Sequence, residues 1–396
     1  MGIRDKFTRR PKPERPDIPQ SAAELTPEWF TGVLEMPGQV VDVRTEEIGS
    51  DIGFMGEVHR CHLTWAEDAS PERPASVIVK VPTQNDENFA VGDAMQAYER
   101  EIVVYQQMRE TIGLPMPRYF HGAMDPDPAP WLDRPLLFLF EHLPIRGVNW
   151  VIARLISVAS KSKRRYILVL EDIADARPPA QLVGGSPEDA HRALELLARF
   201  HAHNWMSVDA RDTYKRIWPL DRANRVFQAS YLRNRGGFLE RYGAAVDAHT
   251  VERLDEIQER VPEIGEALAA EPWTMLHGDY RLDNILFRPD DDIVVLDLQG
   301  LSVGRPAVDV AYFITTALTA EHRAEEDELL RTYHDALVAA GVSTYSWDQL
   351  VHDCGLTKEM LAHRLVGSAD VLDTSISGGD DVLLDVLQLR VLDWLN

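Results

Sequence analysis

Two aspartates and one asparagine stand in an order that suits the transfer of a phosphoryl group. Asp279 and Asn284 lie five positions apart in HGDYRLDN, and Asp297 follows thirteen positions later at the end of the apolar run IVVL. Phosphoryl transfer needs a carboxylate beside the accepting hydroxyl and oxygen ligands for the Mg²⁺ that bridges the phosphates. The spacing therefore predicts Asp279 and Asn284 as catalytic residues, with Asp279 as the base and with Asn284 and Asp297 as metal ligands.

The simplest alternative is an acidic hairpin on a solvated surface. Such a hairpin would need neither His277 and Gly278 directly before Asp279 nor an aspartate at the end of an apolar strand. We therefore favour the catalytic interpretation.

Lys80, in SVIVKVP, is the candidate cation for the α- and β-phosphates of a nucleoside triphosphate. It lies on a short strand, at a suitable interval after a glycine-containing loop. A lone lysine on a strand can equally protect a sheet edge, but the hairpin downstream favours the nucleotide role. Its carboxylate partner should come from the next helix, where Glu99 and Glu101 flank opposite sides of the apolar stripe. Periodicity does not choose between them.

The loop GSDIGFMG separates two strands and contains Gly53 and Gly56. Backbone N–H groups in such a loop can contact phosphates, so these two glycines are predicted to bind the nucleotide. The loop lacks the Gly-Lys-Ser/Thr of a P-loop, and a strand follows it, which excludes a dinucleotide fingerprint. Glycines between strands also serve as ordinary hairpin turns.

The surrounding pattern predicts an α+β, bilobal, protein-kinase-like fold. Residues 25–171 should form a β-rich N-lobe that binds the nucleotide, with one helix from AMQAYEREIVVYQQMRETIG and an insertion near 125–165. Residues 172–396 should form a mainly helical C-lobe with the catalytic loop and the acceptor site. Residues 1–24 are rich in proline and are expected to be a mobile tail.

Two segments together resemble a known group of enzymes. LHGDYRLDNILF and VLDLQGLSVGRPAVDVAYFI look like the aminoglycoside phosphotransferase-like small-molecule kinases, and most like their ecdysteroid-kinase-like branch. The resemblance runs from about Leu25 to the C-terminal helices and is sharpest between His277 and Phe313. It implies the same fold, ATP or GTP with Mg²⁺ as cofactors, and the roles already given to the aspartates and the asparagine of the hairpin.

The same resemblance implies roles for further positions. It prefers Glu101 as the partner of Lys80, and it places the backbone from Glu171 to Ile173 against the adenine. Gln299 stands where protein kinases carry glycine, so a protein-kinase-like activation flip is not expected. Asp309, in GRPAVDVAYF, is expected to be a buried structural residue that binds the loop backbone.

Composition limits the partners and the compartment. Forty-one Lys and Arg against 64 Asp and Glu give a net charge of −23, which argues against nucleic acid and anionic membranes as partners. Two distant cysteines suggest no disulfide framework and a reducing cytoplasm, and no apolar stretch reaches the roughly 18 residues of a membrane span. Oligomeric state stays open.

We therefore predict Mg²⁺-dependent transfer of the γ-phosphate of ATP or GTP to a small-molecule hydroxyl. The acceptor is expected to be a partly apolar alcohol, because the insertion carries apolar and aromatic residues such as Trp131 and Trp150. The net charge of −23 keeps an aminoglycoside as the alternative. A catalytically silent nucleotide-binding module is the rival of another class. A protein kinase is disfavoured, because only seven positions separate Asp297 from Gly304.

Overall fold

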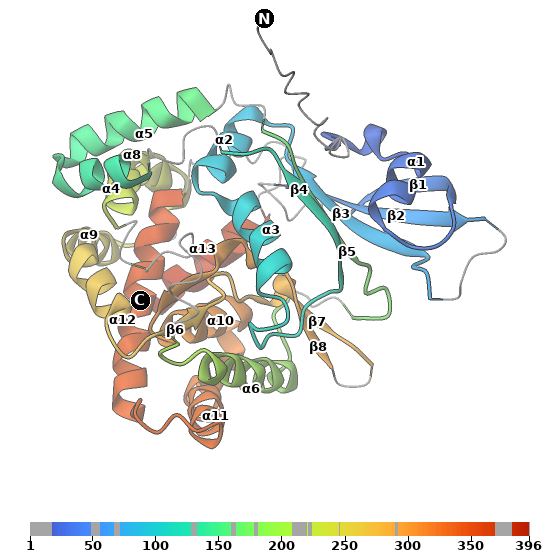
Figure 1. Ribbon diagram of the computed structural model, residues 1–396. Helices are drawn as coiled ribbons and strands as arrows, with labels where there is room; N and C mark the ends of the chain where they lie inside the picture. The colour runs from blue at the N-terminus through green and yellow to red at the C-terminus, as the bar shows by residue number, and fades with distance from the viewer. Residues whose placement is uncertain are drawn as a thin grey trace, which may run out of the picture.

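The computed structural model describes residues 18–48, 56–66, 72–127, 133–159, 164–177, 181–207, 220, 224–244, 246–289, 292–368 and 382–395. A five-stranded antiparallel sheet near the N-terminus is followed by a mainly helical region (Figure 1). This arrangement confirms the α+β, protein-kinase-like fold expected from the sequence.

The sheet places the lysine strand in its middle. Its strand order is β1-β2-β3-β5-β4, with Lys80 of β3 opposite Val58 of β2 and Leu168 of β5. Side chains of β5 alternate between two cores: Val169 packs with α1, whereas Leu168 packs with α3. The strands are β1 (Val40–Ile48), β2 (Gly56–Trp65), β3 (Ser76–Pro82), β4 (Tyr119–Met124) and β5 (Tyr166–Glu171).

The helices of the sheet region begin with α1 (Pro27–Val33), whose N-cap Thr26 accepts a hydrogen bond from the Trp29 N–H. Buried side chains begin before residue 25, within the segment 1–24 that was expected to be a mobile tail. Ile18 is buried in the same cluster as α1, because an apolar side chain gains more from that core than from water. A short 3-10 turn, η1 (Ala22–Glu24), joins the two.

Two helices, not one, separate β3 from β4. These are α2 (Asp86–Ala94) and α3 (Ala97–Gln107). Gln96 between them has a φ of 56°, in the left-handed region, which ends the helical hydrogen-bond pattern. The single helix expected from AMQAYEREIVVYQQMRETIG corresponds to α3, whereas α2 before it was not expected.

The connection between β4 and β5 forms two helices that reach the helical region. They are α4 (Asp133–His142) and α5 (Ile145–Ala159), and α5 packs against α2 on one side and α8 on the other (Figure 1). Arg225 of α8 donates to the Leu143 carbonyl oxygen at 2.6 Å. Trp131 lies outside the described residues. Trp150 is 70% exposed, and its contact with an acceptor stays a prediction.

Two short hairpins position the catalytic loop within the helical region. The outer pair is β6 (Thr274–Leu276) with β9 (Ser302–Gly304), and the inner pair is β7 (Ile285–Phe287) with β8 (Ile293–Val295). The turns are η4 (Leu282–Asn284) and η5 (Leu298–Gly300). Around them lie α6 (Pro187–His203), α8 (Asn224–Tyr242), α9 (Ala248–Ala269), α10 (Ala307–Ala317), η6 (Ala320–Glu325), α11 (Glu326–Ala339), α12 (Trp347–Ser368) and α13 (Val382–Leu395).

None of the helices in the described part of the chain combines the length and the apolar character needed to cross a lipid bilayer.

Asp309 of α10 holds the start of the catalytic loop. Its carboxylate is fully buried and accepts the backbone N–H groups of His277 at 2.6 Å and Gly278 at 2.9 Å. His201 Nε2 lies 3.2 Å from the same carboxylate. Gly278 has a φ of +80°, and a Cβ there would come within 2.0 Å of the Gly300 carbonyl oxygen. The loop thus depends on a buried acceptor and on close backbone contact.

We expect Asp309→Asn to lower the free energy of unfolding by about 3 kcal/mol, because one carboxylate oxygen becomes an NH₂ that faces a backbone N–H. Urea unfolding followed by circular dichroism measures this. Asp348→Asn, at an exposed position, is the matched control. Equal unfolding midpoints for the two variants would show that the buried carboxylate does not support the loop.

Candidate active site

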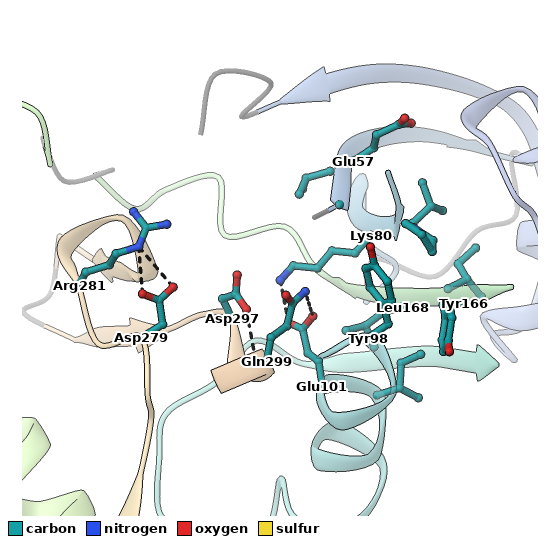
Figure 2. A pocket seen from close by; sticks show the side chains of 16 residues that line it. Glu57, Lys80, Tyr98, Glu101, Tyr166, Leu168, Asp279, Arg281, Asp297 and Gln299 are labelled. Carbon is teal, nitrogen blue, oxygen red and sulfur yellow. Dashed lines mark hydrogen bonds and ion pairs between the residues drawn. The ribbon is translucent and has the colours of Figure 1, made fainter. Parts of the chain in front are cut away.

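A cavity of about 200 Å³ lies between the sheet and the catalytic hairpin (Figure 2). The sheet and α3 supply one wall, and the segments around Asp279 and Asp297 supply the other. The cavity thus joins residues that are far apart in the sequence. Its lining consists of Gly56, Glu57, Val58, Lys80, Val81, Pro82, Tyr98, Glu101, Ile102, Tyr166, Ile167, Leu168, Asp279, Arg281, Asp297 and Gln299.

Lys80 and Glu101 form an ion pair inside this cavity. Lys80 Nζ lies 2.7 Å from Glu101 Oε1, and the Glu101 side chain is 3% exposed. Burial alone would lower the pKa of Lys80, but the charges of Glu101 and Asp297 raise it to about 12. Burial raises the pKa of Glu101, and Lys80 opposes that shift. The lysine is therefore charged at neutral pH and is fixed by a carboxylate from α3.

Glu99, which periodicity left open, turns to another partner. Its carboxylate lies 3.4 Å from Arg164 Nη2, just before β5. Arg164 also pairs with Asp93 at 3.0 Å. Packing on opposite sides of α3 thus separates the two glutamates.

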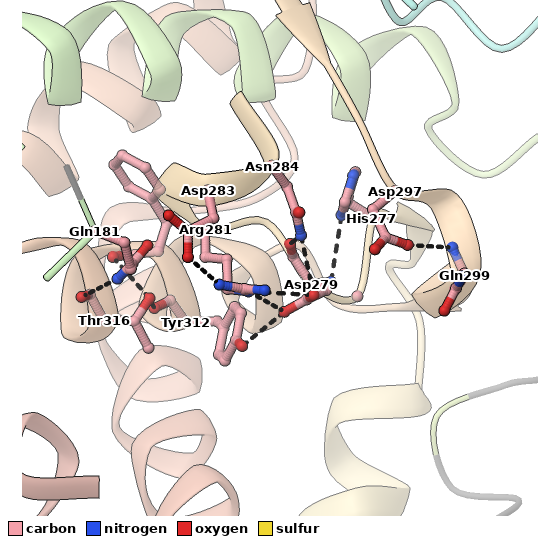
Figure 3. Close-up of polar contacts among 12 residues, drawn as sticks. Gln181, His277, Asp279, Arg281, Asp283, Asn284, Asp297, Gln299, Tyr312 and Thr316 are labelled. Atoms are coloured by element: carbon pink, nitrogen blue, oxygen red, sulfur yellow. Dashed lines mark hydrogen bonds and ion pairs between the residues drawn. The ribbon is translucent and has the colours of Figure 1, made fainter. Parts of the chain in front are cut away.

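Asp279 is held by three neighbours (Figure 3). Its Oδ1 accepts the Tyr312 hydroxyl at 2.7 Å, and its Oδ2 accepts the Asn284 side-chain amide at 2.9 Å. Arg281 Nε lies 3.3 Å from the carboxylate and is held in turn by Asp283. The carboxylate is therefore oriented at the edge of the cavity, as a positioned base would be.

The side-chain nitrogen and oxygen of Asn284 differ in whether they already make hydrogen bonds. Its NH₂ donates to the backbone and to the carboxylate of Asp279, at 2.8 and 2.9 Å. Its side-chain oxygen receives no hydrogen bond from the residues that the structure describes, and an amide oxygen is a suitable ligand for Mg²⁺. The geometry is thus compatible with the predicted metal role.

Asp297 follows β8 and has a left-handed φ of 60°. Its side chain accepts the Gln299 N–H at 3.3 Å. Burial alone would raise the pKa of Asp297, but Lys80, His277 and this N–H together hold the pKa below its usual value. An ionised carboxylate and the free oxygen of Asn284 would suit Mg²⁺, which takes few protein ligands beside phosphate oxygens. Within the described ranges, no group of three or more His, Cys, Asp or Glu could hold a metal without such help.

The remaining predicted nucleotide contacts are distributed unevenly. Gly56 lines the cavity, whereas Gly53 lies outside the described residues. Glu171 and Ile173 do not line it. The Glu171 side chain accepts the Arg118 N–H at 2.9 Å, so it is bound to the neighbouring strand. Contact between this backbone and adenine stays a prediction.

Sequence reasoning missed two residues beside Asp279, namely Arg281 and Tyr312. Arg281 stands two positions after Asp279 in the same loop, so a cation near the carboxylate was visible as a local signal. Tyr312 lies one helical turn after Asp309, on the face of α10 that meets the loop. That signal depends on knowing that α10 packs there.

The ecdysteroid kinase-like family matches residues 145–342, which is half of the 396 residues. The matched range includes the catalytic hairpin and Tyr312. The chain belongs to the ecdysteroid kinase-like family. Membership confirms the resemblance found in the sequence and places the chain among the small-molecule kinases, for which nucleotide and Mg²⁺ are the implied cofactors.

Solved structures support the fold. A protein of Ralstonia eutropha JMP134 designated an aminoglycoside phosphotransferase is 16% identical with a TM-score of 0.50, over 93% of this chain and 96% of its own. Choline kinase from Cryptosporidium parvum Iowa II is 10% identical with a TM-score of 0.50, over 89% of this chain and 88% of its own. No curated protein sequence matches the chain. At these identities the likeness establishes the fold, which this member of the ecdysteroid kinase-like family shares with both.

Proposed function

We propose that this protein transfers the γ-phosphate of ATP or GTP, with Mg²⁺, to a hydroxyl of a small, partly apolar alcohol. Lys80 would bind the α- and β-phosphates, Asn284 and Asp297 would hold the metal, and Asp279 would orient and deprotonate the acceptor hydroxyl. Positioning and charge neutralisation would supply most of the rate acceleration, because the transition state is loose.

One observation carries this proposal. A single cavity brings Lys80 with its partner Glu101 together with Asp279 and Asp297. A module that only binds a nucleotide needs the lysine and the metal ligands, but it has no need of a carboxylate oriented by Tyr312 at the open end of the site. The arrangement therefore favours catalysis over silent binding.

The charge around Asp279 favours an apolar alcohol over an aminoglycoside. Four of the cavity's 16 lining residues are acidic, and Lys80 and Arg281 face three of them. Most of the negative charge in the cavity is therefore balanced, and the cavity has no strong preference for a cationic ligand. On α12, Arg364 lies 4.5 Å over the Phe227 ring, without a carboxylate partner in the described part of the chain. Burial lowers the pKa of Arg364 to about 10, and the Tyr312 phenol opposes that shift. Arg364 thus adds a positive charge near Tyr312, the hydrogen-bond partner of Asp279, and a polycation would gain little there.

An assay that detects the nucleoside diphosphate product, ADP or GDP, tests the function with purified protein. One panel holds hydroxylated apolar compounds such as sterols, a second holds aminoglycosides, and each is run with Mg-ATP and with Mg-GTP. We expect turnover in the apolar panel, lowered by about 10²- to 10⁴-fold in the Asp279→Asn variant. Turnover of aminoglycosides alone would refute the acceptor class, and Mg-nucleotide binding without turnover of any hydroxyl compound would favour the silent module.

A further inference from the structure

Gln299 contacts the carboxylate that holds the candidate phosphate-binding lysine. It lies in η5, directly against α3. Its side-chain amide donates to Glu101 Oε2 at 3.3 Å, while Lys80 Nζ donates to Glu101 Oε1 at 2.7 Å (Figure 2). The two donors thus divide the carboxylate of Glu101 between them.

Burial makes this division important. The Glu101 side chain is 3% exposed, so water does little to solvate either of its oxygens. Burial raises the pKa of Glu101, and the hydrogen bonds from Lys80 and Gln299 both lower it. If the amide were removed, Oε2 would lose its donor, and an unsatisfied buried carboxylate oxygen is costly. The ion pair with Lys80 therefore depends on Gln299.

The backbone of Gln299 is fixed by the same two segments. Arg100, the neighbour of Glu101 on α3, donates from its guanidinium to the Gln299 carbonyl oxygen and, at 3.0 Å, to that of Met95. The Gln299 N–H donates to Asp297 Oδ1 at 3.3 Å. One residue thus contacts both the partner of the lysine and the candidate metal ligand.

We propose that Gln299 is a positioning residue for the triphosphate half of the site, which fixes Glu101 toward Lys80 and orients Asp297. This inference rests on the proposed function, and Gln299 itself need not touch the nucleotide. A glycine at this position would keep the backbone contact with Arg100 but would leave Glu101 Oε2 without the amide donor. Glutamine ties the helix to the metal-binding strand end instead.

The alternative is that Gln299 only fills space next to Glu101. A space-filling residue would tolerate a side chain of the same shape, and the effect of its replacement would not depend on the residue at position 101. Gln299→Met keeps the length of the side chain and removes the donor without adding a charge. A double-mutant cycle with Glu101→Gln therefore separates the two interpretations.

Calorimetry of Mg-ATP binding to the full chain measures the cycle. We expect Gln299→Met to weaken binding by about 10-fold in the wild-type background, because the buried Glu101 Oε2 loses its donor, and by less than about threefold beside Glu101→Gln, where no buried charge is left without a donor. Adenosine, which lacks the phosphates that Lys80 would bind, should change by less than about twofold. Gln39→Met makes the same change at an exposed position and is the matched control.

Equal effects of Gln299→Met in the two backgrounds, or equal losses for ATP and adenosine, would overturn the positioning role. If wild-type protein binds no Mg-nucleotide, the proposed function fails and this inference fails with it. Urea unfolding checks that each variant is folded. Should Gln299→Met not fold, Gln299→Leu replaces it, with weaker Mg-ATP binding expected only where Glu101 is present.

Discussion

Asp279→Asn should lower turnover by about 10²- to 10⁴-fold while Mg-ATP binding stays close to that of wild type. The amide cannot accept the proton of the acceptor hydroxyl, and its NH₂ would face the NH₂ of Asn284, which now donates to Oδ2. Lys80 and Asp297 are untouched by the change, so the nucleotide keeps its predicted contacts. Coupled ADP release measures turnover, and calorimetry measures affinity.

The control for this variant is Asp348→Asn, which makes the same chemical change at an exposed position of α12. It should retain full turnover. Undiminished turnover of Asp279→Asn would remove Asp279 from the role of base. Loss of nucleotide affinity to the same degree as turnover would instead show that the carboxylate mainly supports the fold of the loop.

Asp297→Asn should remove most of the gain in ATP affinity that Mg²⁺ confers, and should lower turnover by about 10²- to 10³-fold. The carboxylate of Asp297 is ionised at neutral pH, because Lys80 and the Gln299 N–H hold its pKa below the usual value in spite of burial. An amide in its place offers the metal no negative charge. ATP affinity is measured with Mg²⁺ and with a chelator for both proteins.

Asp292→Asn, in the turn of the same hairpin, is the control, because this side chain is exposed. It should leave the Mg²⁺ dependence unchanged. An unchanged Mg²⁺ dependence in Asp297→Asn would show that the metal is held elsewhere, and the assignment of Asn284 as the second ligand would fall with it.

Local patterns predicted the parts of the site that adjoin one another in the sequence. The interval from Asp279 to Asn284 and Asp297 indicated a loop followed by a hairpin, and the structure has β7 and β8 there. Lys80 was placed on a strand by alternation at a period of two, and β3 confirms it. In each case the sequence interval between the functional residues is also the interval that defines the local strand or loop. One sequence pattern therefore predicts both the functional residue and the element that carries it.

Packing decided what the sequence left open. Glu99 and Glu101 are equivalent by periodicity, and they differ only because Arg164 meets one and Lys80 the other. Gln96 has no feature that predicts a left-handed backbone, so the break between α2 and α3 was not visible. These contacts join segments that are distant in the sequence, and no local pattern records them.

The insertion between β4 and β5 has a consequence for motion. Covalently, the sheet region continues into the helical region at Glu171, but α5 also packs on α8, and Arg225 binds the Leu143 carbonyl oxygen. The two halves of the molecule are therefore joined at the α5–α8 contact as well as at the covalent connection and at the contact of α3 with η5. A rotation about the covalent connection must separate α5 from α8 before the halves can swing apart. Release of the proposed nucleotide should thus involve only small relative movements of the two halves unless α5 and α8 separate. The strength of the α5–α8 contact would then set the rate at which the nucleoside diphosphate leaves.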